Sequence, residues 1–146
     1  MTAERWQRLG LLVLGVPQTA IGLWALLAPR DWYDTFPGGG REWLPAFGPY
    51  NEHFATDAGA GILAAGVLAL AAAIALERRV VQVAMLGYLA WSVPHALWHL
   101  TAIDEALGTT DDVINIGALA VTVAVPLVLL LTANRLGRSP AQGVRP

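Results

Sequence analysis

Four long runs of apolar residues alternate along this chain with polar segments. The runs cover about residues 9–28, 54–76, 80–101 and 113–133. Each holds roughly the 20 residues that an α-helix needs to cross the hydrocarbon core of a membrane. The pattern therefore predicts an all-α protein, an integral membrane four-helix antiparallel bundle.

The segment between the first two runs is the only long connection, and its composition is unusual. From Pro29 to Glu52 it holds four prolines, the run Gly38 to Gly40, and six aromatic side chains. Proline and glycine at this density exclude a long helix, whereas aromatic rings favour the membrane interface. We expect an outer loop with one or two short helical turns, forming a lid over one end of the bundle.

The remaining segments are shorter and polar. Residues 77–79 predict a tight turn, residues 102–112 form an acidic link with four carboxylates and no arginine, and residues 135–146 predict a disordered tail. Arg5 and Arg8 before the first run resemble the start of a signal peptide. That run exceeds the usual apolar length of about 7–15 residues, so we expect it to be retained as a helix.

The distribution of arginine predicts the orientation in the membrane. Two arginines precede the first run, two lie in the turn at residues 77–79 and three lie in the tail, whereas the long connection has two. Arginine collects on the cytoplasmic side of membrane proteins. We therefore expect both termini in the cytoplasm and the protein in the bacterial cytoplasmic (inner) membrane.

Composition supports this class and excludes others. Apolar residues make up 55% of the 146 residues, charged residues only 14%, and the mean hydropathy is +0.52. An ordinary soluble domain carries about a quarter charged residues. The net charge is −2 without a basic cluster, which gives no support for a nucleic-acid partner. The absence of cysteine excludes disulfides and thiolate metal sites.

With this orientation the polar residues of the runs gather on the outer side. All three histidines lie there, as do all carboxylates except Glu4 and Glu77. Gln18 follows Pro17 near the middle of the first run, where we expect it to satisfy backbone groups that the proline leaves open. The candidate pocket residues are His53, Asp57, His95, His99, Asn115 and Gln18.

The spacing of these residues suggests a metal site as one hypothesis. His53 and Asp57 are four residues apart, as are His95 and His99, so each pair shares one helical face. If the two faces meet, Asp57 lies within reach of the histidines of the third run. Three imidazoles and a carboxylate suit zinc, iron or copper.

Two other interpretations compete with a metal site. The polar residues can form a structural network that fixes helix packing, or they can form a site for proton transfer or a small ligand. An ionisable group inside a span usually marks function, which favours a site at His95 and Asp57. No arrangement of nucleophile and base is recognisable, so the sequence does not decide whether the protein is an enzyme.

The chain resembles the DoxX-like group of small four-helix bacterial membrane proteins. The resemblance rests on four short spans, the segment Gly22 to Pro29, the glycine-rich second run, and the segments Asn51–Gly59 and Pro94–Leu100, which are similar to those of uncharacterised actinobacterial members. It implies a role as a subunit of a membrane oxidoreductase assembly, with a membrane protein partner or a homo-oligomer and a quinone ligand. The thiol chemistry of that group is not implied, because cysteine is absent.

A more remote similarity, to the sterol-isomerase and sigma-2-receptor type of membrane protein, implies a lipid-like ligand beside buried acids. The alternative to a ligand site is a scaffold. In that case the small residues of the second run pack against another membrane subunit, and the polar residues only set the register of the helices.

Overall fold

The computed structural model describes residues 2–101 and 107–136, and these form an all-α protein, as predicted. The helices are α1 (Ala3–Leu27), α2 (Pro29–Thr35), α3 (Glu52–Ala75), α4 (Arg78–Thr101) and α5 (Thr109–Thr132). Smaller elements are the hairpin β1 (Pro37–Gly38) and β2 (Arg41–Glu42), and the 3₁₀ helices η1 (Leu44–Phe47) and η2 (Ala133–Arg135). In this part of the chain, four helices are long and apolar enough to cross a membrane, which suggests a membrane protein.

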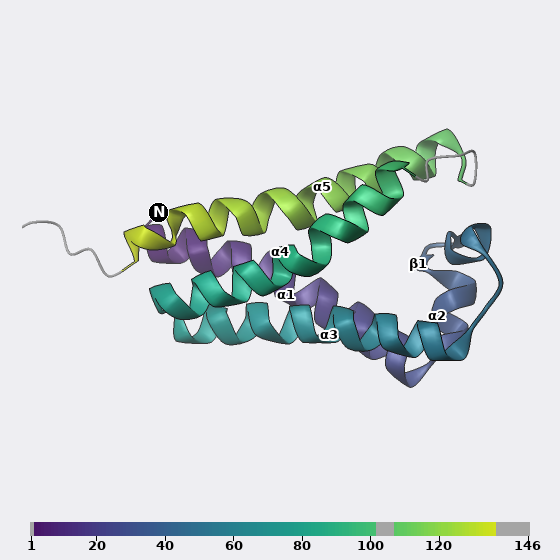
Figure 1. The fold of residues 1–146 in the computed structure, drawn as a ribbon, viewed down its shortest axis with the longest axis horizontal. Coiled ribbons are helices and arrows are strands. Elements are labelled where there is room, and N and C mark those ends of the chain that lie inside the picture. Colours follow the sequence, from purple (N-terminus) through teal and green to yellow (C-terminus); the bar gives the residue numbers. More distant parts are fainter. Residues whose placement is uncertain (1, 102–106, 137–146) are drawn as a thin grey trace, which may run out of the picture.

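The four long helices run antiparallel to their neighbours in sequence (Figure 1). α1 and α3 lie side by side, whereas α4 begins next to α3 and crosses over to α5 (Figure 1). One end of the bundle holds the start of α1, the end of α5 and the α3–α4 turn, and we call it the termini end. The opposite end holds residues 28–51, the long connection, and we call it the connection end.

Local signals explain where two of the helices begin and end. The Thr2 hydroxyl accepts a hydrogen bond from the amide of Arg5 and caps α1. The side chain of Asn51 accepts one from the amide of Phe54 and caps α3. α1 stops before Pro29, and α3 ends at Leu76 in the left-handed conformation.

Glycine brings α1 and α3 into backbone contact. A Cβ atom added to Gly22 of α1 would lie 2.5 Å from the backbone nitrogen of Leu63. In the reverse direction, a Cβ atom on Gly66 of α3 would lie 2.5 Å from the backbone nitrogen of Thr19. No side chain fits at these distances, so glycine is what permits the closest approach between the helices.

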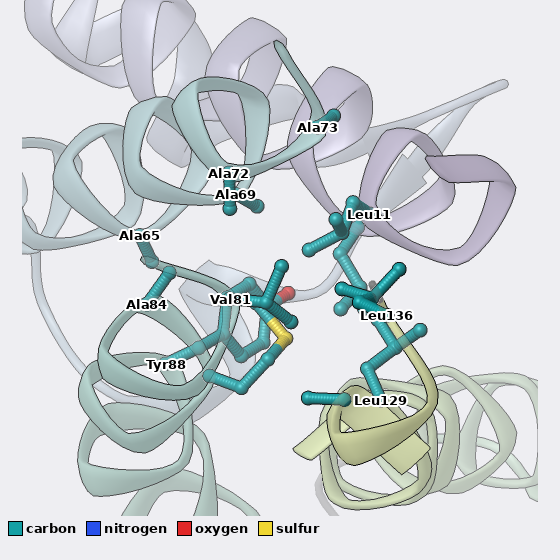
Figure 2. Close-up of a cluster of buried hydrophobic side chains, with 13 residues drawn as sticks. Leu11, Ala65, Ala69, Ala72, Ala73, Val81, Ala84, Tyr88, Leu129 and Leu136 are labelled. Carbon is teal, nitrogen blue, oxygen red and sulfur yellow. The ribbon is translucent and has the colours of Figure 1, made fainter. Parts of the chain in front are cut away.

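The main core lies toward the termini end and combines small residues of α3 with large residues of the other helices. Figure 2 shows alanines of α3, among them Ala69 and Ala72, facing Leu11 of α1 and Val81 of α4. Tyr88 of α4 and Leu129 of α5 complete the contact of the four long helices. The helices therefore converge around small side chains at this end.

The long connection is folded against the other end of α1 and α3. Trp32 of α2 is buried with Ala25 of α1 and Ala55 of α3. The indole Nε1 of Trp24 donates a hydrogen bond to the Asp31 carboxylate, at 2.6 Å. Aromatic side chains, Trp32 of the connection and Trp24 of α1, thus attach the connection to the bundle.

Candidate functional site

A row of four polar side chains runs along one face of α4. Tyr88, Ser92, His95 and His99 follow one another at spacings of four, three and four residues. These are the spacings of neighbours on a helical surface. We call these four residues the polar stripe. It extends the predicted histidine pair inward by two helical turns, toward the core.

Burial changes along the polar stripe. The side chains of Tyr88 and Ser92 are fully buried, with 0% of their surface exposed. His99 is partly buried and His95 is exposed. The face of α4 that packs into the core at Tyr88 is therefore uncovered at His95, because α4 crosses away from α3 toward α5 (Figure 1).

The buried half of the polar stripe contains unpaired hydrogen-bonding groups. The hydroxyls of Tyr88 and Ser92 have no hydrogen-bond partner among the described residues. Across from them, Gln18 of α1 is buried and lies close to the Tyr88 hydroxyl, without the geometry of a hydrogen bond. The hydroxyl of the adjacent Thr19 is also unpartnered. Buried polar groups are rarely left this way, because each loses its hydrogen bonds to water.

Gln18 has a different environment from the one the sequence suggests. Its side chain is buried and lies against the Tyr88 hydroxyl of α4. Its burial beside Tyr88 instead makes it part of the inner end of the candidate site.

Aromatic rings flank the histidines at the exposed half. The imidazole of His95 stacks on the indole of Trp91, with ring centroids 5.2 Å apart and planes at 15°. The His95 and His99 rings meet edge to face at 4.7 Å. Phe47 of η1 packs edge-on against His99 at 5.3 Å. Histidines and aromatic rings thus alternate at this end of α4.

α5 and the long connection enclose the His99 side of the site. The Asn115 side-chain nitrogen lies 3.3 Å from Nδ1 of His99. It can donate a hydrogen bond only if that ring nitrogen carries no proton. Arg41 of β2 forms an ion pair with Asp111 of α5 at 2.7 Å, which ties the connection to α5. The connection therefore reaches across the bundle to the helix that faces His99.

The structure does not bring His53 and Asp57 to the histidines of α4. His53 Nε2 lies 3.4 Å from Asp57 Oδ2, and the two side chains are 78% and 65% exposed. Within residues 2–101 and 107–136, no group of three or more His, Cys, Asp or Glu side chains could hold a metal ion. The expected convergence of Asp57 with His95 or His99 is therefore wrong, and the four-residue metal site does not form.

The rotation of α3 places Asp57 and His53 away from α1. Its buried face passes through Ala55, Gly59 and Gly66, and Gly59 and Gly66 pack against α1. Asp57 is two residues from Ala55, about 200° around the helix at 3.6 residues per turn. It therefore points away from α1 and lies on the same face as Gly61, whose added Cβ would lie 3.8 Å from the Trp91 indole of α4. Beyond Trp91, α4 crosses toward α5 (Figure 1), so neither Asp57 nor His53 reaches its histidines.

Sequence reasoning missed Tyr88, Ser92 and Phe47. The first two could have been found by extending the histidine spacing inward in steps of three and four residues. Nothing in the sequence distinguishes Phe47 from the other aromatic residues of the connection, because its position depends on the folding of the connection across the bundle.

No protein-family model, no curated protein and no solved structure matches this chain.

Proposed function

We propose that this chain is an integral membrane protein of the bacterial cytoplasmic membrane, with both termini in the cytoplasm, and that its polar stripe binds a small membrane-soluble molecule. The ligand class is a flat ring that carries hydrogen-bonding oxygens, such as a quinone or a phenol. The role is one of binding. The imidazoles of His95 and His99 could exchange a proton with a ligand oxygen, but no reaction is assigned.

The membrane orientation rests on charge. Arg5, Arg8, Arg78, Arg79 and Arg135 belong to the termini end, while only Arg30 and Arg41 belong to the connection end. Arginine is enriched on the cytoplasmic side. The polar stripe then runs from the middle of the membrane to its outer surface.

The unpartnered hydroxyls of Tyr88 and Ser92 carry the proposal of a ligand site. Both are fully buried and lie on the same face as the two histidines. An unsatisfied polar group in an apolar interior costs about 1–3 kcal/mol of stability. A purely structural network would pair these groups with each other. Hydroxyls without a partner instead suit a molecule that enters from the exposed end of the stripe.

The aromatic side chains favour a flat ligand. Trp91 already stacks on one planar ring, that of His95, and Phe47 packs edge-on against another, that of His99. Such pairs contribute about 0.5–1.5 kcal/mol beyond area burial. The oxygens of a ring held between these groups can accept hydrogen bonds from the hydroxyls of Tyr88 and Ser92. They can also form hydrogen bonds with the imidazoles of His95 and His99.

The test measures binding of a short-chain benzoquinone to the purified protein in detergent, with quenching of tryptophan fluorescence as the signal. Loss of one hydrogen bond of about 1 kcal/mol weakens binding roughly fivefold, so we expect at least this loss in His95→Leu and in Ser92→Ala. His53→Leu is the matched control, because His53 lies on α3 outside the stripe. Equal losses in His53→Leu and His95→Leu would contradict the proposal.

A second candidate function, a scaffold, is favoured by the exposure of α5. In its most apolar stretch only 17% is buried inside the protein, compared with 33% in each of the other long helices. A membrane protein partner, or a second copy, could cover this surface. A partner subunit cannot pack on all the small residues of α3, since Gly59 and Gly66 already pack on α1. Membership of the DoxX-like group, with its oxidoreductase assemblies, remains a prediction consistent with either role.

A cysteine at Val121, which is exposed on α5, tests the scaffold. A crosslinked membrane subunit that co-purifies in stoichiometric amount would support it. Benzoquinone binding that depends on His95, without such a subunit, would favour the ligand site.

A further inference from the structure

A groove separates the first half of α1 from the last part of the chain's final span, at the termini end. Its volume is about 520 Å³, within the range of about 300–1,000 Å³ typical of small-molecule pockets. It extends from Ala3 to Val13 on α1 and from Ala124 to Arg135 on the other side. At about 1.5 Å per residue this is roughly 15 Å, half of the hydrocarbon core. The groove therefore has the length of one membrane leaflet.

The groove is polar at one end only. Its walls are mostly apolar side chains, among them Trp6, Val13 and Val128. The polar lining residues are Gln7, Thr132 and Arg135, which lie near the start of α1 and the end of the final span. Apolar walls with a positive charge at the membrane surface match the structure of an anionic lipid.

Gln7 at this end is buried and carries an unpartnered oxygen. Only 3% of its surface is exposed. Its Nε2 donates to the Leu129 carbonyl at 3.2 Å and to the Thr132 hydroxyl at 2.8 Å. The carbonyl can only accept, so the amide orientation is determined. Oε1 has no partner in the described part of the chain and requires a donor.

We propose that this groove binds an anionic phospholipid of the cytoplasmic leaflet. One acyl chain lies between α1 and α5, the phosphate lies at Arg135, and a headgroup hydroxyl donates a hydrogen bond to Oε1 of Gln7. The inference rests on the membrane orientation proposed above but not on the polar stripe of α4.

A lipid fits the groove better than a helix of a second copy. A transmembrane helix would extend along the whole bilayer, whereas the groove covers one leaflet. In a symmetric dimer formed through this face, Arg135 of each copy would also approach the same residue of its partner, and like charges repel. A phospholipid instead supplies both an opposite charge and a hydroxyl donor.

Native mass spectrometry tests the proposal. The protein is purified in detergent with equal amounts of phosphatidylglycerol and phosphatidylcholine that carry identical acyl chains, and the lipids that remain bound after release from the detergent are identified. We expect the wild type to retain phosphatidylglycerol with a preference of about fivefold or more, the value of one hydrogen bond, because phosphatidylcholine has no hydroxyl donor for Gln7 and its choline cation opposes Arg135. Arg135→Gln should reduce the preference, because the phosphate loses its charged partner while the hydroxyl contact to Gln7 remains. Val128→Trp, which fills the groove at an exposed position, should reduce binding of both lipids.

Arg79→Gln is the matched control, because Arg79 is an exposed arginine of the termini end that does not line the groove. It should keep the preference. Equal loss in both arginine variants would mean general attraction to a positive surface and would overturn the site. Equal retention of both lipids by the wild type, or a lipid-free dimer disrupted by Val128→Trp, would also overturn it. None of these outcomes bears on benzoquinone binding by α4.

Discussion

The α1–α3 interface and the polar stripe of α4 are opposite solutions to packing in an apolar protein. At the interface, glycines bring two backbones together and leave no room for a side chain at Gly22 or Gly66. Along the stripe, the buried hydroxyls of Tyr88 and Ser92 have no hydrogen-bond partner in the part of the chain that the structure describes. We therefore expect the first region to contribute mainly to stability, whereas the second is the site of the proposed ligand. Natural proteins commonly lose stability where function requires unsatisfied groups.

Gly22→Ala should have the largest effect on stability. The added Cβ atom would lie 2.5 Å from the Leu63 backbone nitrogen, which cannot move without separating the helices. We expect a loss of at least about 1–3 kcal/mol, the usual cost of overpacking. Thermal or SDS-induced unfolding in detergent measures it. Gly117→Ala is the control, since outside its own helical turn no atom of the described residues lies within 4 Å of its added Cβ. A similar loss in both variants would mean that the contact is not critical.

Ser92→Ala should act in the opposite direction. It removes a buried hydroxyl without a partner, so we expect stability to rise by about 1 kcal/mol while benzoquinone binding falls. Thr56→Ala is the control, because its hydroxyl donates to the Glu52 carbonyl at 2.8 Å. It should bring no such gain. A Ser92→Ala protein that is less stable than wild type would place this hydroxyl in the structural network instead.

Arg41→Gln tests whether the long connection covers the stripe. Its ion pair with Asp111 is partly exposed, so we expect less than about 1 kcal/mol of lost stability, and less still at high salt. Release of the connection from α5 should nonetheless speed benzoquinone exchange in stopped-flow measurements. Arg30→Gln removes a more exposed pair within α2 and should leave the exchange rate unchanged. Identical rates in Arg41→Gln and wild type would exclude a covering role.

The smallest expected effect is the coupling between Asp57 and His95. The Asp57 side chain is exposed and paired with His53, so Asp57→Ala and His95→Ala should have additive effects on unfolding. Independent sites add within about 0.3–0.5 kcal/mol. A double-mutant cycle in detergent gives the value. A coupling well above this range would mean that the two helix faces meet after all.

The sequence by itself determined the helices of this protein. Apolar runs predicted the four long helices, because their length and composition are local properties. The cap at Asn51 is also a local property, since it depends only on the next few residues. The spacing of His95 and His99 correctly placed them on one face, as their contact at 4.7 Å shows.

Only the tertiary structure decided which faces meet. Spacing places His53 and Asp57 on one side of α3, but it does not say which neighbour that side faces. The answer depends on α1, which packs against Gly59 and Gly66 and so leaves Asp57 on the same side as Gly61, which faces Trp91 of α4. The crossing of α4 from α3 to α5 likewise separates the histidines from α3 and brings His99 to Asn115. Helix rotation and crossing result from the packing of all the helices at once, so no single segment of the sequence specifies them.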